Sequence, residues 1–108
     1  DFVLVDVRNR EAWHQGHAAG AVHMPHGEIA RRAPREISLT TPVVVYCWSP
    51  GCNGGARGAV EFAQLGYSVR EMIGGYEYWA REGLPVEAAQ GPLPRMFDPL
   101  VMPVRARP

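Results

Sequence analysis

A short apolar run near the middle of the chain ends in a cysteine, and a glycine-rich loop follows it. The run is Pro42–Tyr46, the cysteine is Cys47 and the loop spans residues 48–55. A helical pattern then runs from Ala56 to Leu65. A buried strand that enters a helix through a short loop is the repeating unit of α/β folds. This order therefore favours a sheet in which parallel strands are joined by helices.

The rest of the chain, to about residue 87, alternates predicted strands with predicted helices. Strands are expected at Phe2–Val7, Gly20–Met24, Val43–Cys47 and Ser68–Ile73. Helices are expected from an Asn9 cap to Gln15, at Glu28–Arg35, at Ala56–Leu65 and from Gly74-Gly75 to Gly83. We therefore predict an α/β fold with a mostly parallel sheet and helices on both faces. The helix after the cysteine is expected to bury Ala56, Ala59, Val60 and Ala63.

Cys47 lies where parallel sheets bind their ligands, beyond the carboxyl end of a strand. Arg8 and Gly74 follow other strands at the same edge. The backbone N–H groups of the loop and of the helix start converge at this place, and such groups stabilise anions. A thiolate is an anion, so we expect the site to lower the pKa of the Cys47 thiol and to make it a nucleophile.

The residues around this cysteine are the candidate substrate-binding residues. Trp48 and Ser49 are expected to line the pocket, and the Ser49 hydroxyl can donate a hydrogen bond to an oxyanion. Arg8 and Arg57 are candidate supporting cations, because the planar guanidinium group recognises oxyanions. The whole candidate active loop comprises Trp48, Ser49, Pro50, Gly51, Cys52, Asn53, Gly54 and Gly55.

Structural alternatives stay open at these positions. Cys47 could be an inert core cysteine. Cys52 is either a resolving thiol, which takes sulfur from Cys47 or forms a reversible disulfide with it, or a small residue that shapes the pocket. Arg8 could instead form an architectural salt bridge with Asp6, and Arg57 could face solvent.

Composition excludes several functions. All eleven basic residues are arginine, so a lysine Schiff base is excluded. The formal net charge is zero, which argues against nucleic acid or an anionic membrane as a partner. The four histidines, His14, His17, His23 and His26, fall on a predicted helix, a loop and a strand, so no metal site is expected.

The expected cellular location is the cytoplasm, by default. No apolar stretch approaches the roughly 20 residues that span a bilayer, and no secretory signal is visible. Two cysteines are too few for a disulfide framework of the secreted kind. The first residue is Asp1 rather than methionine, which is compatible with the removal of an upstream piece.

The alternating pattern fails from about Glu87. Residues 88–108 contain five of the ten prolines and show no periodicity, so no regular element of any length is expected there. We therefore predict one domain at residues 1–87 and a Pro-rich C-terminal extension at residues 88–108, extended or partly disordered.

Four segments together resemble the motifs of single-domain rhodanese-like sulfurtransferases, from Asp1 to about Glu87. They occur in the family's order and spacing. They are Leu4–Arg8 with Glu11 and Trp13, then Gly16–Pro25, then Val43–Cys47, and finally Leu65–Tyr67 followed by Ile73–Trp79. The resemblance implies a rhodanese-like α/β fold.

The resemblance also implies sulfur transfer by covalent catalysis. Cys47 would attack the outer sulfur of a donor such as thiosulfate and become a persulfide, and cyanide or a thiol would then remove that sulfur. The loop N–H groups would hold the persulfide and the leaving anion. The implied partners are a small sulfur-donor anion and a cyanide or thiol acceptor, which includes a protein acceptor. No metal or organic cofactor is implied.

The chain departs from the family pattern in three respects. The strand and helix that usually precede the first motif are missing, and Cys52 is a loop cysteine that many members lack. The active loop is also longer than usual, which puts thiosulfate in doubt as the natural donor.

Two other functions stay open. A cysteine-loop phosphatase or arsenate reductase would need an arginine at the position of Asn53. A noncatalytic rhodanese-like module that binds a partner would need no nucleophile, yet Cys47 is present.

Overall fold

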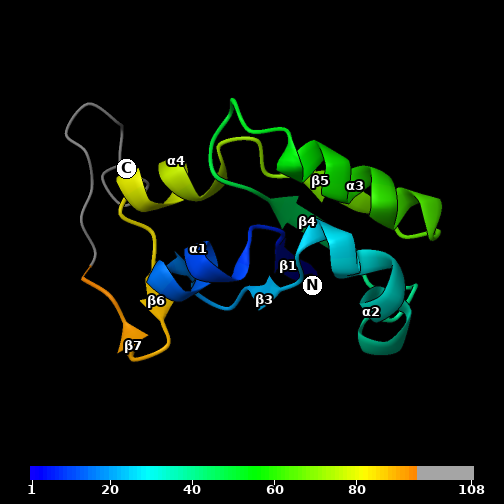
Figure 1. Cartoon of the computed structure of the whole chain (residues 1–108), viewed down its shortest axis with the longest axis horizontal. Coiled ribbons are helices and arrows are strands. Elements are labelled where there is room, and N and C mark those ends of the chain that lie inside the picture. The colour runs from blue at the N-terminus through cyan, green and yellow to red at the C-terminus, as the bar shows by residue number, and fades with distance from the viewer. Residues whose placement is uncertain (95–108) are drawn as a thin grey trace.

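A parallel sheet of four strands forms the centre of the structure, a computed structural model that describes residues 1–94 (Figure 1). The strands lie in the order β3-β1-β4-β5, with β1 at Val3–Asp6, β3 at Val22–His23, β4 at Val43–Tyr46 and β5 at Val69–Glu71. β1 pairs in parallel with β3 and β4, and β4 pairs in parallel with β5. The predicted parallel sheet is confirmed.

Helices lie on both sides of this sheet (Figure 1). They are α1 Arg10–Gln15, α2 Ile29–Glu36, α3 Gly54–Gln64 and α4 Gly75–Arg81, with a 3-10 turn, η1, at His26–Glu28. α2 packs on α3, which itself lies against β4 and β5. The cap of α1 is as predicted, because the Asn9 side chain accepts a hydrogen bond from the N–H of Ala12. The predicted α/β fold with its intervening helices is confirmed.

The buried face of α3 differs from the prediction. The structure buries Gly54, Gly55, Gly58 and Phe62, whereas Val60 is 54% exposed. A Cβ atom at Gly58 would lie 3.0 Å from a methyl group of Val7. The helix therefore approaches the sheet through its glycines, and the pattern of alanines gave the wrong face because glycine carries no hydrophobic signal.

The structure also contains a second, antiparallel sheet that was not predicted from the sequence. It contains β2 at His17–Ala18, β6 at Val86–Ala88 and β7 at Gly91–Pro92, in the order β2-β6-β7. Strands of two or three residues are too short to show a period, and the pairing joins distant parts of the chain. β6 includes residue 87, where the predicted domain ends. The division into a domain at residues 1–87 and an extension at residues 88–108 stays a prediction. Residues 95–108 of the predicted extension lie outside the described residues.

The core lies between the parallel sheet and α2 and α3. Its fully buried side chains include Val5, Val45, Met24, Ile29 and Phe62. Cys47, at the end of β4, is 9% exposed and belongs to the edge of the same cluster. Within residues 1–94, no helix has the length and apolar character needed to cross a bilayer.

Candidate active site

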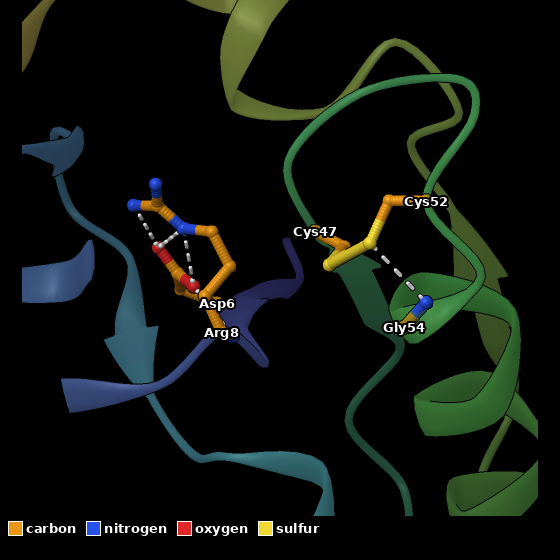
Figure 2. The surroundings of a disulfide bond; sticks show 5 residues. All are labelled: Asp6, Arg8, Cys47, Cys52 and Gly54. Carbon is orange, nitrogen blue, oxygen red and sulfur yellow. Dashed lines mark hydrogen bonds and ion pairs between the residues drawn. A yellow bond between two sulfur atoms is a disulfide. The ribbon is translucent and has the colours of Figure 1, made fainter. Parts of the chain in front are cut away.

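Cys47 directly follows β4 and is joined to Cys52 by a disulfide bond (Figure 2). Their Cα atoms are 6.5 Å apart. A turn between them brings the two residues together, since the N–H of Cys52 donates to the carbonyl of Ser49 at 3.0 Å. The structure therefore places Cys52 next to the predicted nucleophile. Of the alternatives considered for Cys52, it shows the one in which Cys52 forms a disulfide with Cys47.

Gly54, the first residue of α3, makes this approach feasible. A Cβ atom there would lie 2.6 Å from Sγ of Cys47 and 3.5 Å from Sγ of Cys52. The N–H of Gly54 donates to Sγ of Cys52 at 3.4 Å. Within residues 1–94, this is the one hydrogen bond from a loop amide to a cysteine sulfur, and its acceptor is Cys52 rather than Cys47. The predicted stabilisation of a Cys47 thiolate by the loop amides stays a prediction for the reduced protein.

The start of α4 holds the backbone at the beginning of the loop. The N–H of Tyr76 donates to the carbonyl of Cys47 at 2.9 Å, and the N–H of Glu77 donates to the carbonyl of Trp48 at 2.8 Å. Gly75 has a φ of +67°, and a Cβ atom there would lie 2.7 Å from the backbone nitrogen of Ser49. Only glycine fits this contact without displacing the loop.

Arg8 forms a buried salt bridge with Asp6 beside the cysteine loop (Figure 2). Its Nε and Nη2 atoms donate to the Asp6 carboxylate at 2.8 to 3.1 Å, and Nη2 also donates to the carbonyl of Gly16 at 2.6 Å. The guanidinium carbon lies 4.4 Å from the ring centroid of Trp48 and 4.5 Å from that of Tyr76. The architectural interpretation of Arg8 is confirmed.

One nitrogen of Arg8 has a different environment from the others. Nη1 is buried and finds no hydrogen-bond partner among the described residues. A buried donor of this kind is costly unless a water molecule or a ligand satisfies it. The unpartnered Nη1 group thus supports a direct role of Arg8 in substrate binding, and that role stays a prediction.

A cavity of about 260 Å³ opens beside the two cysteines. Its walls contain most of the predicted site and three further residues. The lining residues are Val7, Arg8, Asn9, His26, Cys47, Trp48, Cys52, Asn53, Gly54 and Arg57. Arg57 thus lies at the cavity, although it is exposed. Asn9 and His26 were not predicted as site residues, because they precede the loop by many positions and only the fold brings them to it.

Four residues of the predicted active loop are absent from the cavity wall. Pro50 and Gly51 are exposed at the tip of the loop, and Ser49 is half-buried. Gly55 is buried against β5, where a Cβ atom would lie 2.6 Å from a carboxylate oxygen of Glu71. The expected contact of Ser49 with a substrate oxyanion thus stays a prediction.

The charges at the cavity favour an anion. Arg8 and Arg57 contribute to its wall, and no Asp or Glu stands among the described residues that line it. The buried carboxylate of Asp6 balances the charge of Arg8 and also accepts from the hydroxyl of Tyr46 at 2.6 Å. Arg57 therefore supplies the positive charge at the cavity wall, and Arg8 offers the unpartnered N–H groups of Nη1 to a small oxyanion next to the cysteine pair.

The histidines have separate structural contacts. Nδ1 of His17 lies 2.9 Å from the carbonyl of Trp13, and Nε2 of His23 lies 2.8 Å from the carbonyl of Arg8. Over residues 1–94 no group of three or more His, Cys, Asp or Glu side chains is placed to hold a metal ion.

Fold and site together define a class of protein, an α/β domain with a cysteine in the loop between a central parallel strand and the next helix. A family model described as Rhodanese-like domain matches residues 1–82, which is most of the chain. The protein belongs to the rhodanese-like domain family.

Several solved structures share this fold. The BH2092 protein of Bacillus halodurans is 40% identical, with a TM-score of 0.78 over 83% of this chain and 66% of that chain. The rhodanese-like domain of the Alr3790 protein from Anabaena sp. is 27% identical, with a TM-score of 0.75 over 81% of this chain and 99% of that chain. A rhodanese from E. coli, described with anions, is 26% identical, with a TM-score of 0.68 over 82% and 100%. The chain thus spans just under two thirds of the first relative and nearly all of the other two.

Proposed function

We propose that this domain is a sulfurtransferase that carries a sulfane sulfur as a persulfide on Cys47. The observation that carries the proposal is the position of Cys47, at the carboxyl end of β4 in a cavity lined by Arg8 and Arg57. Membership of the rhodanese-like family and the anions described with the E. coli rhodanese support it.

The reaction begins from the reduced cysteine pair. The Cys47 thiolate attacks the outer sulfur of a donor such as thiosulfate, the donor's S–S bond breaks, and sulfite leaves with the bonding electron pair. A thiophilic acceptor, cyanide or a thiol, then attacks the outer sulfur of the persulfide and restores the thiolate. The guanidinium groups of Arg8 and Arg57 favour binding of the anionic donor.

Intact mass spectrometry tests this proposal directly. Reduced protein, freed of reductant, is incubated with thiosulfate, and the gain of one sulfur atom and the release of sulfite are measured. Cys52→Ser should gain the sulfur, whereas Cys47→Ser should neither gain it nor release sulfite. Sulfur uptake by Cys47→Ser at the rate of the protein with Cys47 intact would overturn the assignment of the nucleophile.

A noncatalytic partner-binding module is the second candidate. The observation in its favour is that large apolar side chains are exposed around the loop and α4, with Trp48 43%, Ile73 65% and Tyr78 38% exposed. Absence of sulfur uptake in every variant that retains Cys47 would favour this candidate. A cysteine-loop phosphatase has less support, because Asn53 is exposed at the start of α3 and supplies no guanidinium group.

A further inference from the structure

The second cysteine of the loop is as well placed for chemistry as the first. Cys47 and Cys52 line the same cavity and are bonded to each other through their sulfur atoms. Cys52 is half-buried, whereas Cys47 is 9% exposed. Stabilisation of the fold does not explain this disulfide well, because the loop that it closes is short and the surrounding backbone is already held by α3 and α4.

We propose that Cys52 resolves the persulfide on Cys47 and releases its outer sulfur as hydrosulfide. This inference rests on the proposed function, because it needs the persulfide that sulfur transfer forms. It adds a second activity, in which the domain reduces sulfane sulfur to sulfide at the expense of its own two thiols.

The step balances without any further reactant. The Cys52 thiolate attacks Sγ of Cys47, and a bond forms between the two Sγ atoms. The bond between Sγ of Cys47 and the outer sulfur breaks, and that sulfur leaves with the electron pair. It takes up the proton that Cys52 gave up and leaves as hydrosulfide. The persulfide sulfur is thereby reduced, and the two cysteine sulfurs are oxidised to the disulfide that the structure contains.

The surroundings of Cys52 suit an attacking thiolate. Sγ accepts the hydrogen bond from the N–H of Gly54, at the beginning of the eleven-residue helix α3. An N–H group and the positive end of a helix both favour a negatively charged sulfur. Because Gly54 has no Cβ, the inner sulfur at Cys47 stays within reach of this thiolate. The departing sulfur enters the cavity that Cys47 lines together with Arg57.

The cycle closes with a dithiol reductant. One thiol of the reductant attacks Sγ of Cys52, the more exposed of the two residues, and Cys47 leaves as a thiolate that is ready for the next donor. The second thiol of the reductant then breaks the mixed disulfide and frees Cys52. The exposed loop tip at Pro50 and Gly51 leaves this side of the disulfide open to such a partner.

A single-turnover experiment tests the inference. Reduced protein, freed of reductant, is mixed with thiosulfate, and sulfite, sulfide and intact mass are followed together. The unaltered protein should release sulfite and then about one equivalent of sulfide, and end as the disulfide without added sulfur. Cys52→Ser and Cys52→Ala should release sulfite, keep the sulfur on Cys47, and release sulfide at least about 100-fold more slowly, because the intramolecular attack is lost. Sulfur uptake also shows that both variants are folded.

The outcomes separate this inference from the proposed function. Sulfide release from Cys52→Ser at the unaltered rate, or a stable persulfide on Cys47 in the unaltered protein, would each overturn the resolving role and leave the sulfurtransferase proposal standing. An outer sulfur mapped to Cys52 would overturn both the resolving role and the assignment of the persulfide to Cys47. If no protein that retains Cys47 releases sulfite or gains sulfur, the proposed function fails, and the inference fails with it.

Discussion

A Cβ atom at Gly54 would lie 2.6 Å from Sγ of Cys47, closer than Cβ atoms in folded proteins come to atoms that they are not bonded to. This contact links the first residue of α3 to the sulfur at the end of β4. The same glycine donates its N–H to Sγ of Cys52. The spacing of the two sulfurs therefore depends on the absence of a side chain at this position.

Replacing Gly54 by alanine should interfere with the chemistry of the cysteine pair. The new methyl group must displace Sγ of Cys47, and such overpacking costs about 1–3 kcal/mol. If this cost raises the free energy of the transition state, the rate falls by about 5- to 150-fold. We expect slower disulfide formation by at least about fivefold when free thiols are counted after addition of an oxidant. Gly27→Ala is the matched control, because nothing lies within 4 Å of a Cβ atom there. Equal rates for Gly54→Ala and Gly27→Ala would contradict the steric argument.

Arg57→Ala should weaken the binding of an anionic sulfur donor. Arg57 is exposed at the cavity, so its attraction for an anion is screened by solvent. We expect the KM for thiosulfate to rise by about two- to fivefold at low ionic strength, with little change in kcat and a smaller effect in high salt. Arg35→Ala removes an equal charge from an exposed position on α2, away from the cavity lining, and should leave KM unchanged. A fall in kcat without a rise in KM would show that Arg57 acts in the chemical step instead.

Local signals in the sequence predicted the elements that carry the site. The branched run at Val43–Tyr46, the helix cap at Asn9 and the helix end at Gln15 each depend on a few neighbouring residues, and each is found where it was expected. These features depend on backbone sterics and short-range hydrogen bonds, which the sequence displays directly. Cys47 could therefore be placed at the end of a parallel strand before any tertiary contact was known.

Features that depend on distant contacts could not be predicted in this way. β2 pairs with β6 across 70 positions of the sequence, from His17 to Glu87, and neither strand is long enough to show a period. Asn9 and His26 reach the cavity only because β1 lies beside β4. The contact of Cys52 with Cys47 was one of several alternatives, since the turn that closes it depends on Ser49 and on the missing side chain at Gly54.

Replacing Arg8 by methionine should destabilise the fold rather than only the site. The change leaves the Asp6 carboxylate fully buried without its cation, a loss that typically costs about 3–5 kcal/mol. Urea denaturation at neutral pH measures this cost. Glu77→Gln is the control, because it breaks an exposed ion pair with Arg81 on α4 and should cost about 0.3–0.5 kcal/mol. If Arg8→Met costs no more than Glu77→Gln, the buried pair is not an architectural element.

Tyr46 contributes a stabilisation of the folded state that is lost at alkaline pH. Burial and the negative charge of Asp6, together with the hydrogen bond between the two side chains, raise the pKa of the Tyr46 phenol above its usual value of 10.0. The folded state therefore keeps the proton at a pH where the unfolded chain releases it. The stabilisation is fully present below about pH 10 and falls by about 1.4 kcal/mol for each further pH unit.

Tyr46→Phe should remove both this pH dependence and two hydrogen bonds. The hydroxyl donates to Asp6 at 2.6 Å and accepts from the N–H of Ala18 at 3.0 Å, so its loss should cost about 1–3 kcal/mol near neutral pH. Urea denaturation of both proteins in the Cys52→Ser background, which prevents formation of the intramolecular disulfide, should show a constant difference up to about pH 9 and a shrinking one at about pH 11. The remaining tyrosines are common to both proteins, so their titration cancels in the difference. A difference that stays constant to about pH 11 would show that Tyr46 ionises as readily in the folded protein as in the unfolded chain.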